Sequence, residues 1–293
     1  MNGKKRNTKR TSWLVAALAV LLALALTLAG CGSSNPPSSG NSTSAKNPAL
    51  ANVVAGDGKT LTVATDATFA PMEYMDTNNN FAGFDVELMK AIAKDMGADI
   101  KFVNVEWDAL VTGVSTNAGQ FDMAASAMTI TDERAKSILF SDPYFVSVQA
   151  LAVPKDSSIK SVDDLKKGDK VGVQNGTTGH FWAKDNLQNK GIVIKPYQGG
   201  QDCFTAMAAG EVDAIVIDSP VAGNYTKQAN YNAVSLGAIA GADTENYGFA
   251  LPKGSTALAG AINKSLKNVI NNGTYLELYK RFIDDKNPPV MPQ

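Results

Sequence analysis

Residues 83–97 read Gly-Phe-Asp-Val-Glu-Leu-Met-Lys-Ala-Ile-Ala-Lys-Asp-Met-Gly, and their pattern decides the fold class. Gly83 suits a turn, and Asp85 is a residue type that caps helices. The apolar residues that follow recur near helical spacing, namely Val86, Met89, Ile92, Ala93 and Met96. The pattern predicts a helix over 85–96 that ends at Gly97.

Strand patterns lie on both sides of this helix. Residues 61–64 precede it and residues 100–103 follow it, and both runs are short and rich in β-forming side chains. A second helix is predicted over 108–116, followed by a third strand over 121–124. Thr131 is a residue type that caps a further helix, and acidic residues follow it, as a helix N-terminus favours. Strands and helices therefore alternate.

The alternation repeats in the second half of the chain. Strands are predicted over 170–174, 192–194 and 214–217, and helices after the loop 175–179 and over 202–209. Near the C-terminus, an amphipathic helix over 256–271 is closed by Asn272 and Gly273. Thr274 and Glu277 then predict a capping box for a last helix. Such alternation is typical of parallel sheets with helices on both faces. Two such blocks predict an α/β protein with two lobes and a cleft between them.

The first thirty residues have the pattern of an export signal. Residues 2–10 hold five basic residues and no acid, residues 13–30 are uncharged, and the run ends Leu28-Ala29-Gly30-Cys31. An uncleaved membrane-spanning helix is the alternative, because the apolar run is nearly long enough to cross a bilayer. The ending resembles the lipobox of bacterial lipoproteins, which implies a signal peptide over 1–30 and lipidation of Cys31, with a palmitate-type anchor in the membrane.

The composition after Cys31 restricts the class of function. Residues 31–57 are mostly Gly, Ser, Asn, Pro and Ala, so we interpret them as a flexible tether. Without the five basic residues of the leader, 22 basic residues stand against 28 acidic ones, a formal net charge of −6. An acidic balance argues against nucleic acid as a partner. Cys203 has no second cysteine to pair with if Cys31 is lipidated, and it lies in an apolar helical pattern that indicates a core residue.

Six segments between about Thr60 and Phe282 together resemble the family 3 bacterial extracellular solute-binding proteins. The segments are Thr65-Asp66-Ala67-Thr68-Phe69-Ala70-Pro71, the Gly83 to Met96 helix, Ser126-Ala127-Met128-Thr129-Ile130-Thr131-Asp132-Glu133-Arg134, Phe140-Ser141-Asp142-Pro143-Tyr144, Val171-Gly172-Val173-Gln174 with Gly176-Thr177-Thr178, and Asp213 to Asp218. They occur in the order that the family has. The resemblance is greatest to glutamine-binding and basic amino-acid-binding proteins of ABC importers.

The resemblance implies a two-lobe periplasmic-binding-protein type II fold with a central ligand cleft and a two-strand hinge. Crossings between lobes are expected near 144–149 and 244–248, which gives lobe 1 as 58–147 plus 248–287 and lobe 2 as 148–247. The implied function is the capture of a free polar amino acid at the outer face of the cell membrane, for a permease and an ATPase. Neither a cofactor nor a metal is expected, and the protein is expected to be a monomer.

The resemblance also assigns ligand contacts. Arg134 matches the arginine that grips the ligand carboxylate, and a bidentate guanidinium suits that task. Asp218 matches the aspartate that holds the ammonium, aided by the carbonyl of Ala127. Further donors are expected at Thr129 and at the amides around Thr177 and Thr178, near a helix N-terminus. Met128 belongs to the same matched segment and is included among the ligand-contacting residues. Ala127 departs from the family pattern, which usually has glycine there.

The side chain of the ligand is expected to lie between Phe69 and Trp107, which match aromatic positions of the relatives. Asp66, Gln174 and, less securely, Glu73 are expected to accept or exchange hydrogen bonds with it. Arg134 is the only cation at a matched position, so a ligand with a second carboxylate would face Asp66 unpaired. We therefore expect arginine, lysine, histidine or glutamine as the ligand, with a preference for a cation.

Each of these residues has a simpler interpretation that the sequence leaves open. Arg134 can be a solvated helix charge, Asp218 a helix cap, and the two aromatic residues core packing. The 175–179 loop lacks the ending of a phosphate-binding loop, and the single histidine, His180, suits a surface position. The rival function is an enzyme that resembles cyclohexadienyl dehydratase, which needs a general acid that no carboxylate at Gly179-His180 supplies. A sensor without transport is a further alternative.

Overall fold

The computed structural model describes residues 60–292. The predicted signal peptide (1–30), the lipidation site Cys31 and the tether (31–57) lie outside the described residues. Within the described range, none of the helices is both long and apolar enough to cross a bilayer.

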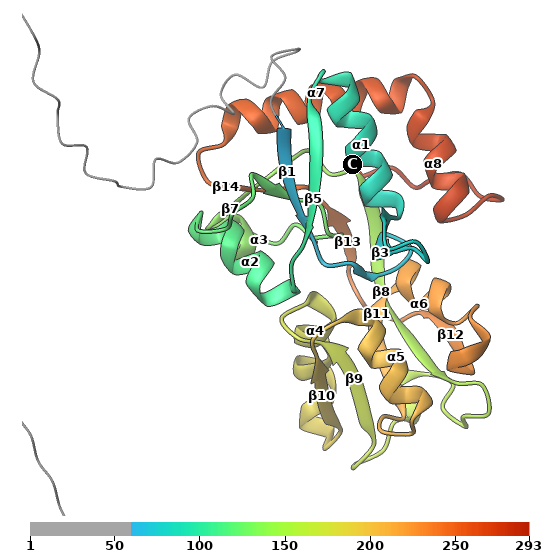
Figure 1. Ribbon diagram of the computed structural model, residues 1–293. Coiled ribbons are helices and arrows are strands. Elements are labelled where there is room, and N and C mark those ends of the chain that lie inside the picture. The colour runs from blue at the N-terminus through green and yellow to red at the C-terminus, as the bar shows by residue number, and fades with distance from the viewer. Residues whose placement is uncertain (1–59, 293) are drawn as a thin grey trace, which may run out of the picture. The chain divides into compact units, whose positions relative to one another are not determined.

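Two sheets occupy separate halves of the described structure (Figure 1). The first sheet has the order β5-β1-β6-β14-β7, with bounds Asp99–Asn104, Thr60–Thr65, Met123–Ala124, Ala250–Pro252 and Ile138–Phe140. Its helices are α1 (Phe84–Asp95), α2 (Trp107–Thr116), α3 (Asp132–Ala135), α7 (Thr256–Asn271) and α8 (Thr274–Phe282). A small antiparallel sheet of β2 (Thr68–Phe69), β3 (Glu73–Met75) and β4 (Phe81–Ala82) adjoins it.

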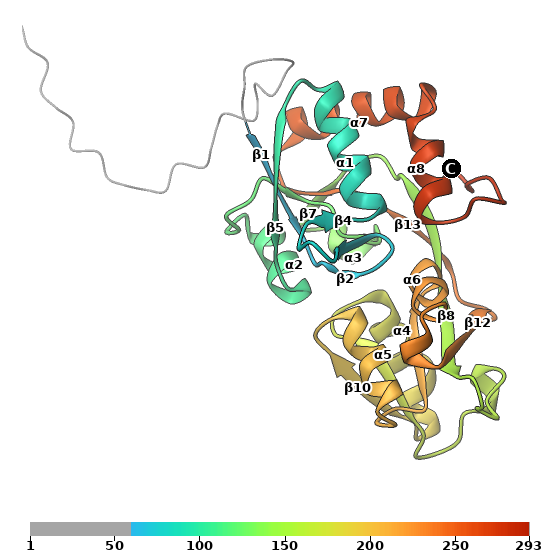
Figure 2. The same ribbon diagram turned by 45° about the vertical axis from the view of Figure 1, so that its right-hand side comes forward.

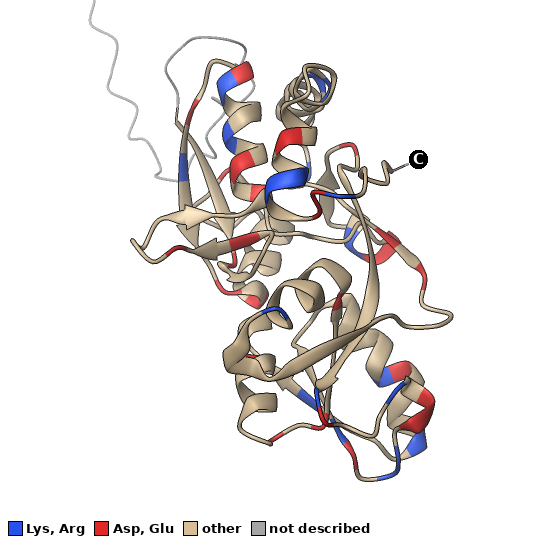
Figure 3. Ribbon diagram, turned by 90° about the vertical axis from the view of Figure 1, so that its right-hand side faces the viewer, with Lys and Arg blue, Asp and Glu red and all other residues tan. Residues whose placement is uncertain are grey.

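The second sheet has the order β10-β9-β11-β8-β12, with bounds Val193–Tyr197, Lys170–Gln174, Ala214–Asp218, Phe145–Pro154 and Ala233–Ala238. Its helices are α4 (Thr178–Leu187), α5 (Gly200–Ala208) and α6 (Ser219–Tyr225), with short 3-10 turns at Val162–Asp164, Gln188–Lys190 and Ala229–Tyr231. Asp and Glu are interspersed with Lys and Arg over both halves (Figure 3).

Two adjacent strands connect the halves. The chain leaves the first sheet after β7, enters β8, and returns to β14 after β13 (Thr244–Tyr247). The start of β8 pairs antiparallel with β13, in a register that sets Phe145 opposite Tyr247 and Val148 opposite Thr244. Figure 2 shows these strands running between the two halves.

Most predicted elements form near their predicted residues, but three local expectations were wrong. The sheets are mixed rather than parallel, because β14 pairs antiparallel with β6 and β7, and β8 pairs antiparallel with β11 and β12. Helix α8 has Gly273 at its N-cap, so Thr274 lies inside the helix and no capping box forms with Glu277. Asp85 does not cap α1, whose N-cap is Gly83.

Asp85 instead supports the loop that leads into the cavity described below. It is fully buried, and its Oδ2 accepts hydrogen bonds from the backbone N–H of Ala127 at 2.8 Å and from the hydroxyl of Tyr144. Burial raises the pKa of Asp85 to about 7, against which these two hydrogen bonds act. The aspartate of the predicted helix motif thus contacts the loop after β6.

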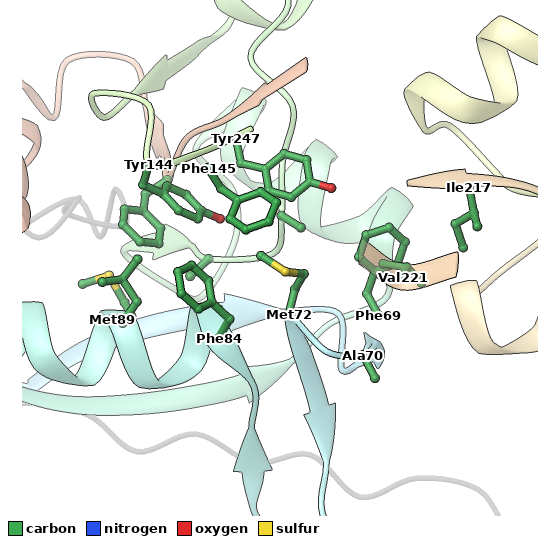
Figure 4. Close-up of a cluster of buried hydrophobic side chains, with 14 of the residues drawn as sticks. Phe69, Ala70, Met72, Phe84, Met89, Tyr144, Phe145, Ile217, Val221 and Tyr247 are labelled. Carbon is green, nitrogen blue, oxygen red and sulfur yellow. The ribbon is translucent and has the colours of Figure 1, made fainter. Parts of the chain in front are cut away.

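An aromatic cluster lies where β8 leaves the first half. Tyr144 stacks on Phe249 with ring centroids 4.3 Å apart, and Phe145 stacks on Tyr247 at 5.4 Å. Figure 4 shows Tyr144 and Phe145 packed with Phe84 above α1. Burying such rings stabilises the fold by about 2 kcal/mol each. The same buried cluster continues to residues of the second half such as Ile217 and Val221.

Candidate ligand-binding site

A cavity with an empty volume of about 300 Å³ is lined by residues from both halves. Its lining consists of Asp66, Phe69, Glu73, Trp107, Ser126, Ala127, Thr129, Arg134, Gln174, Thr177, Thr178 and Asp218. Many of them follow the ends of β1, β6, β9 and β11. Carboxyl ends of strands in open α/β sheets are where ligands bind, so the location suits a binding site.

Of the twelve residues that the sequence predicts as ligand contacts, with Glu73 counted, eleven line this cavity and Met128 does not. The Met128 side chain is buried in a cluster with Leu110, Ile138 and Ala250. Ala127 and Thr129 on either side of it line the cavity, and alternate side chains of extended backbone point to opposite faces. The Met128 side chain therefore packs in the core rather than in the cavity lining.

Arg134 is held by its own loop and by Trp107. Thr131 caps α3 by accepting a hydrogen bond from the backbone N–H of Arg134, which fixes the start of the helix. Arg134 Nη1 donates to the carbonyl of Thr129 at 2.9 Å, and Nη2 donates to the carbonyl of Gly176 at 3.4 Å. Its guanidinium carbon lies 5.1 Å from the centre of the Trp107 ring, a cation–π contact. Burial lowers the pKa of Arg134 to about 10, so the side chain stays cationic at neutral pH.

Asp218 lies at the end of β11 and turns its carboxylate away from the following helix. It occupies the N-cap position of α6 but makes no side-chain cap bond. Its Oδ1 accepts a hydrogen bond from Gln149 Nε2 at 2.7 Å, and its Oδ2 accepts one from the hydroxyl of Tyr247. Burial, and next the charge of Glu245, raise the pKa of Asp218 to about 7. The side chain is therefore not the simple helix cap that the sequence left open.

Two further acids line another part of the cavity. Asp66 accepts hydrogen bonds from Thr68 Oγ1 at 2.9 Å and from Gln174 Nε2 at 2.7 Å, and burial raises its pKa to about 6. Glu73 is fully buried, and its Oε1 accepts a hydrogen bond from Ser126 Oγ at 3.0 Å. Among the described residues, nothing donates to its buried Oε2. Burial raises the pKa of Glu73 well above its usual range. A buried acceptor of this kind is costly unless a donor reaches it.

The aromatic residues form walls of the cavity. Phe69 is 8% exposed and belongs to the large buried cluster, and its ring lies against Gly200 of α5, where an added Cβ would come within 2.8 Å of the ring. Trp107 is 6% exposed at the start of α2, and its buried Nε1 has no hydrogen-bond partner among the described residues. Both side chains line the cavity while they also pack in the core.

The threonines at the start of α4 have different partners. Thr177 is the N-cap, and its Oγ1 accepts from the backbone N–H of His180 and donates to the carbonyl of Gln174. Thr178 begins the helix, so the first amides of α4 lack intrahelical acceptors at a point beside the cavity. His180 lies outside the lining, and its Nδ1 accepts a hydrogen bond from the N–H of Gly176 at 3.2 Å.

The model of the bacterial extracellular solute-binding proteins, family 3, matches residues 61–285. The chain belongs to this family. Over 270 residues this solute-binding protein is 37% identical to a probable histidine-binding protein of Neisseria gonorrhoeae, covering 92% of this chain and 94% of that protein.

Two solved structures are also similar to this solute-binding protein. The arginine-, lysine-, histidine-binding protein ArtJ from Geobacillus stearothermophilus is 38% identical, with a TM-score of 0.71 over 78% of this chain and 97% of the other. The ancestral amino acid-binding protein AncCDT-1, a precursor of cyclohexadienyl dehydratase, is 39% identical, with a TM-score of 0.70 over 76% of this chain and 95% of the other. The two-lobe fold of periplasmic binding proteins is thereby confirmed.

Ala127 of this solute-binding protein adopts a backbone conformation that glycine reaches with less strain than alanine. Its φ of 44° lies in the left-handed region, where a Cβ is strained and glycine is not. The N–H of Ala127 is held by Asp85, so the conformation is fixed by the buried carboxylate beneath the loop. The extra methyl group is accommodated with the loop still lining the cavity.

Sequence reasoning missed three polar residues that support the site of this solute-binding protein. Gln149, Glu245 and Tyr247 come from β8 and β13, and all three contact Asp218 or residues beside it. Gln149, a glutamine inside the mainly apolar strand β8, was the one available signal. Glu245 gives no signal of its own, because a lone acid in a polar segment usually faces solvent.

Proposed function

We propose that this protein captures a free amino acid with a cationic side chain, namely arginine, lysine or histidine, and delivers it to an ABC importer. Glutamine is the neutral alternative. The observation that carries the proposal is the charge of the cavity lining: one guanidinium, Arg134, faces three carboxyl groups, Asp66, Glu73 and Asp218. The histidine-binding relative and the arginine-, lysine-, histidine-binding neighbour support this ligand class.

In the proposed pose, each charged group of the cavity lining contacts one group of the ligand. Arg134 and the first amides of α4 bind the ligand carboxylate, and Asp218 binds the ammonium. The ligand side chain then lies between Phe69 and Trp107 and reaches Asp66 and Glu73. A cation there supplies the donor that the buried Oε2 of Glu73 lacks. An acidic side chain would instead bring a third carboxylate to two buried ones, which is strongly unfavourable.

Closure of two lobes around the ligand is part of the proposal, with lobe 1 as 58–147 plus 248–287, lobe 2 as 148–247, and β8 and β13 as the hinge. Hydrogen bonds also join the two halves outside the proposed ligand contacts. Asn175 Nδ2, for example, donates to Asp108 Oδ2 at 2.7 Å. A ligand that contacts Arg134 and Asp218 at once interacts best with the closed state, so binding favours closure.

The proposal extends to the location and the chemistry. Cys31 is proposed as the site of a lipid anchor, with the tether spanning from the outer face of the membrane to the folded part, and the protein is proposed to act as a monomer. We also propose that it binds its ligand without changing it. His180 lies outside the cavity lining, and the proposed pose assigns each carboxyl group of the lining to charge pairing with the ligand.

A thermal-shift screen of the twenty amino acids tests the ligand class. Arginine, lysine or histidine is expected to raise the melting temperature by several degrees at a concentration about 100-fold above the dissociation constant, because such a ligand stabilises the native state by about 2.7 kcal/mol. A response limited to glutamate, aspartate or apolar amino acids would contradict the pocket assignment. Turnover of prephenate or arogenate above background would favour the enzyme instead.

Binding is expected to weaken in acid. The pKa of Asp218 is about 7 in the ligand-free protein, and its ionised form is the one that pairs with an ammonium. Between pH 8 and pH 5.5 the affinity for L-arginine should therefore fall about 30-fold, as measured by isothermal titration calorimetry. The folding stability of the ligand-free protein should change with pH in the opposite direction. The raised pKa means that the folded state retains a proton which the unfolded state has released, so this carboxyl group lowers stability as pH rises from about 4 to 7. A pH-independent affinity would contradict the assignment.

A further inference from the structure

Glu245 lies on the connecting strand β13, outside the cavity lining, and contacts two residues of the cavity wall. Its Oε2 accepts a hydrogen bond from Thr129 Oγ1 at 2.7 Å and another from Thr178 Oγ1 at 2.9 Å. Its Oε1 accepts from Gln149 Nε2 at 3.1 Å. Both threonines line the cavity, whereas Glu245 does not. One carboxylate thus holds a hydroxyl from each half of the molecule.

The direction of these hydrogen bonds determines what the hydroxyls offer to a ligand. A threonine hydroxyl has one hydrogen and two lone pairs, and an ionised carboxylate can only accept. With their hydrogens given to Glu245, Thr129 Oγ1 and Thr178 Oγ1 retain only lone pairs for other partners. In this arrangement the Thr129 hydroxyl has no hydrogen left to donate to a ligand carboxylate, and the backbone N–H of Thr129 is the donor expected there.

Gln149 also donates its side-chain hydrogens to neighbouring acceptors. Its Nε2 has two hydrogens and three acceptors within reach: Asp218 Oδ1 at 2.7 Å, Glu245 Oε1 at 3.1 Å and Thr178 Oγ1 at 3.2 Å. Its hydrogens are thereby directed to these neighbours. Around Asp218, the side chains consequently present acceptors, which match the N–H groups of an ammonium and oppose a carboxylate.

We propose that Glu245 is a positioning residue that fixes the Thr129 and Thr178 hydroxyls as acceptors and so selects ligands with a protonated α-amino group. It acts through the threonines and through its negative charge, not by touching the ligand. This role rests on the proposed function, because it assigns one end of the amino-acid pose.

The test compares two ligands that differ only in the α-amino group, L-arginine and 5-guanidinopentanoic acid, on wild-type protein and on Glu245→Gln. The amide is the same size, but it carries no charge and has hydrogens to donate to the hydroxyls. The variant is expected to bind L-arginine about 30-fold more weakly, the size of a lost charged hydrogen-bond network. Its affinity for the analogue should stay the same or increase, because the freed hydroxyls can donate to a carboxylate.

Equal weakening of both ligands would overturn the role, since a distorted hinge affects any ligand alike. No change for either ligand would overturn it as well. Thr178→Val and Thr178→Ser form a second, matched pair. The valine variant should lose affinity for L-arginine selectively and the serine variant should retain it, whereas equal behaviour of the two contradicts the proposal. A wild-type protein that binds neither compound overturns the proposed function, and this assignment with it.

Discussion

Arg134→Ala is expected to lower the affinity for L-arginine about a thousandfold, because removing a cation that pairs with a desolvated carboxylate costs about 4 kcal/mol. Among the described residues that line the cavity, the guanidinium is the only cationic group. Without it, the ligand carboxylate keeps only backbone donors and faces Asp218 and Glu245 without compensation. The measurement is calorimetry at neutral pH, with thermal melting to establish that the variant is folded.

The contacts of Arg134 indicate how the variant should fail. Its hydrogen bonds go to carbonyls of Thr129 and Gly176, and its Trp107 contact is at the cavity wall, so truncation leaves the sheets unchanged. Arg281→Ala is the matched control. That arginine lies on α8 over the Phe282 ring, away from the cavity lining, and its loss should leave affinity unchanged. Wild-type affinity in Arg134→Ala would refute the proposed carboxylate contact.

Gly83→Ala is expected to destabilise the protein by about 4 kcal/mol, the upper end of single-residue effects. Gly83 has φ 124°, and a Cβ built on it would lie 2.2 Å from the carbonyl oxygen of Met72. The obstacle is backbone, so no side chain can rotate away to relieve it. In a chain of this size, the melting temperature should fall by about 10 °C. Chemical denaturation with a two-state fit measures the effect.

The variant Gly210→Ala separates the backbone strain of a positive φ from the steric clash with a neighbouring group. Gly210 also has a positive φ, 75°, but nothing lies within 4 Å of the position that a Cβ would take. Only the conformational cost remains there, about 1 kcal/mol. If the two variants lose similar stability, the close contact with Met72 has no energetic weight. The Gly83 effect should also reach the site, because α1 begins at the next residue and contains Asp85, which holds the Ala127 loop.

Local signals in the chain predicted elements well where neighbouring residues alone determine them. The strand Lys170–Gln174 and the helix Thr256–Asn271 form at the residues expected, because their periodicity and their end residues agree. The prediction of a capping box at Thr274 was wrong because Gly273, with φ 87°, takes the N-cap position. Thr274 therefore lies one place inside the helix.

The pairing of strands that lie far apart in the chain was harder to predict from the sequence. Strand β14 is three residues long and lies between β6 and β7, more than a hundred residues away in sequence. Its antiparallel direction depends on the chain returning from the second half, which no local pattern encodes. The Asp85 contacts have the same origin, because Ala127 and Tyr144 reach it from separate loops. A motif aspartate that is suitable for a helix cap was therefore assigned to the wrong partner.

The α/β class, the family and eleven of the twelve residues that line the cavity could be predicted from the sequence, since these depend on residue types within short matched segments. The remaining features depend on the folded structure. It buried Glu73 with an oxygen that lacks a donor, turned Met128 into the core, and brought Glu245 against Thr129 and Thr178. Burial and hydrogen-bond direction arise from contacts between segments that are distant in sequence, and these contacts exist only once both halves have packed against each other.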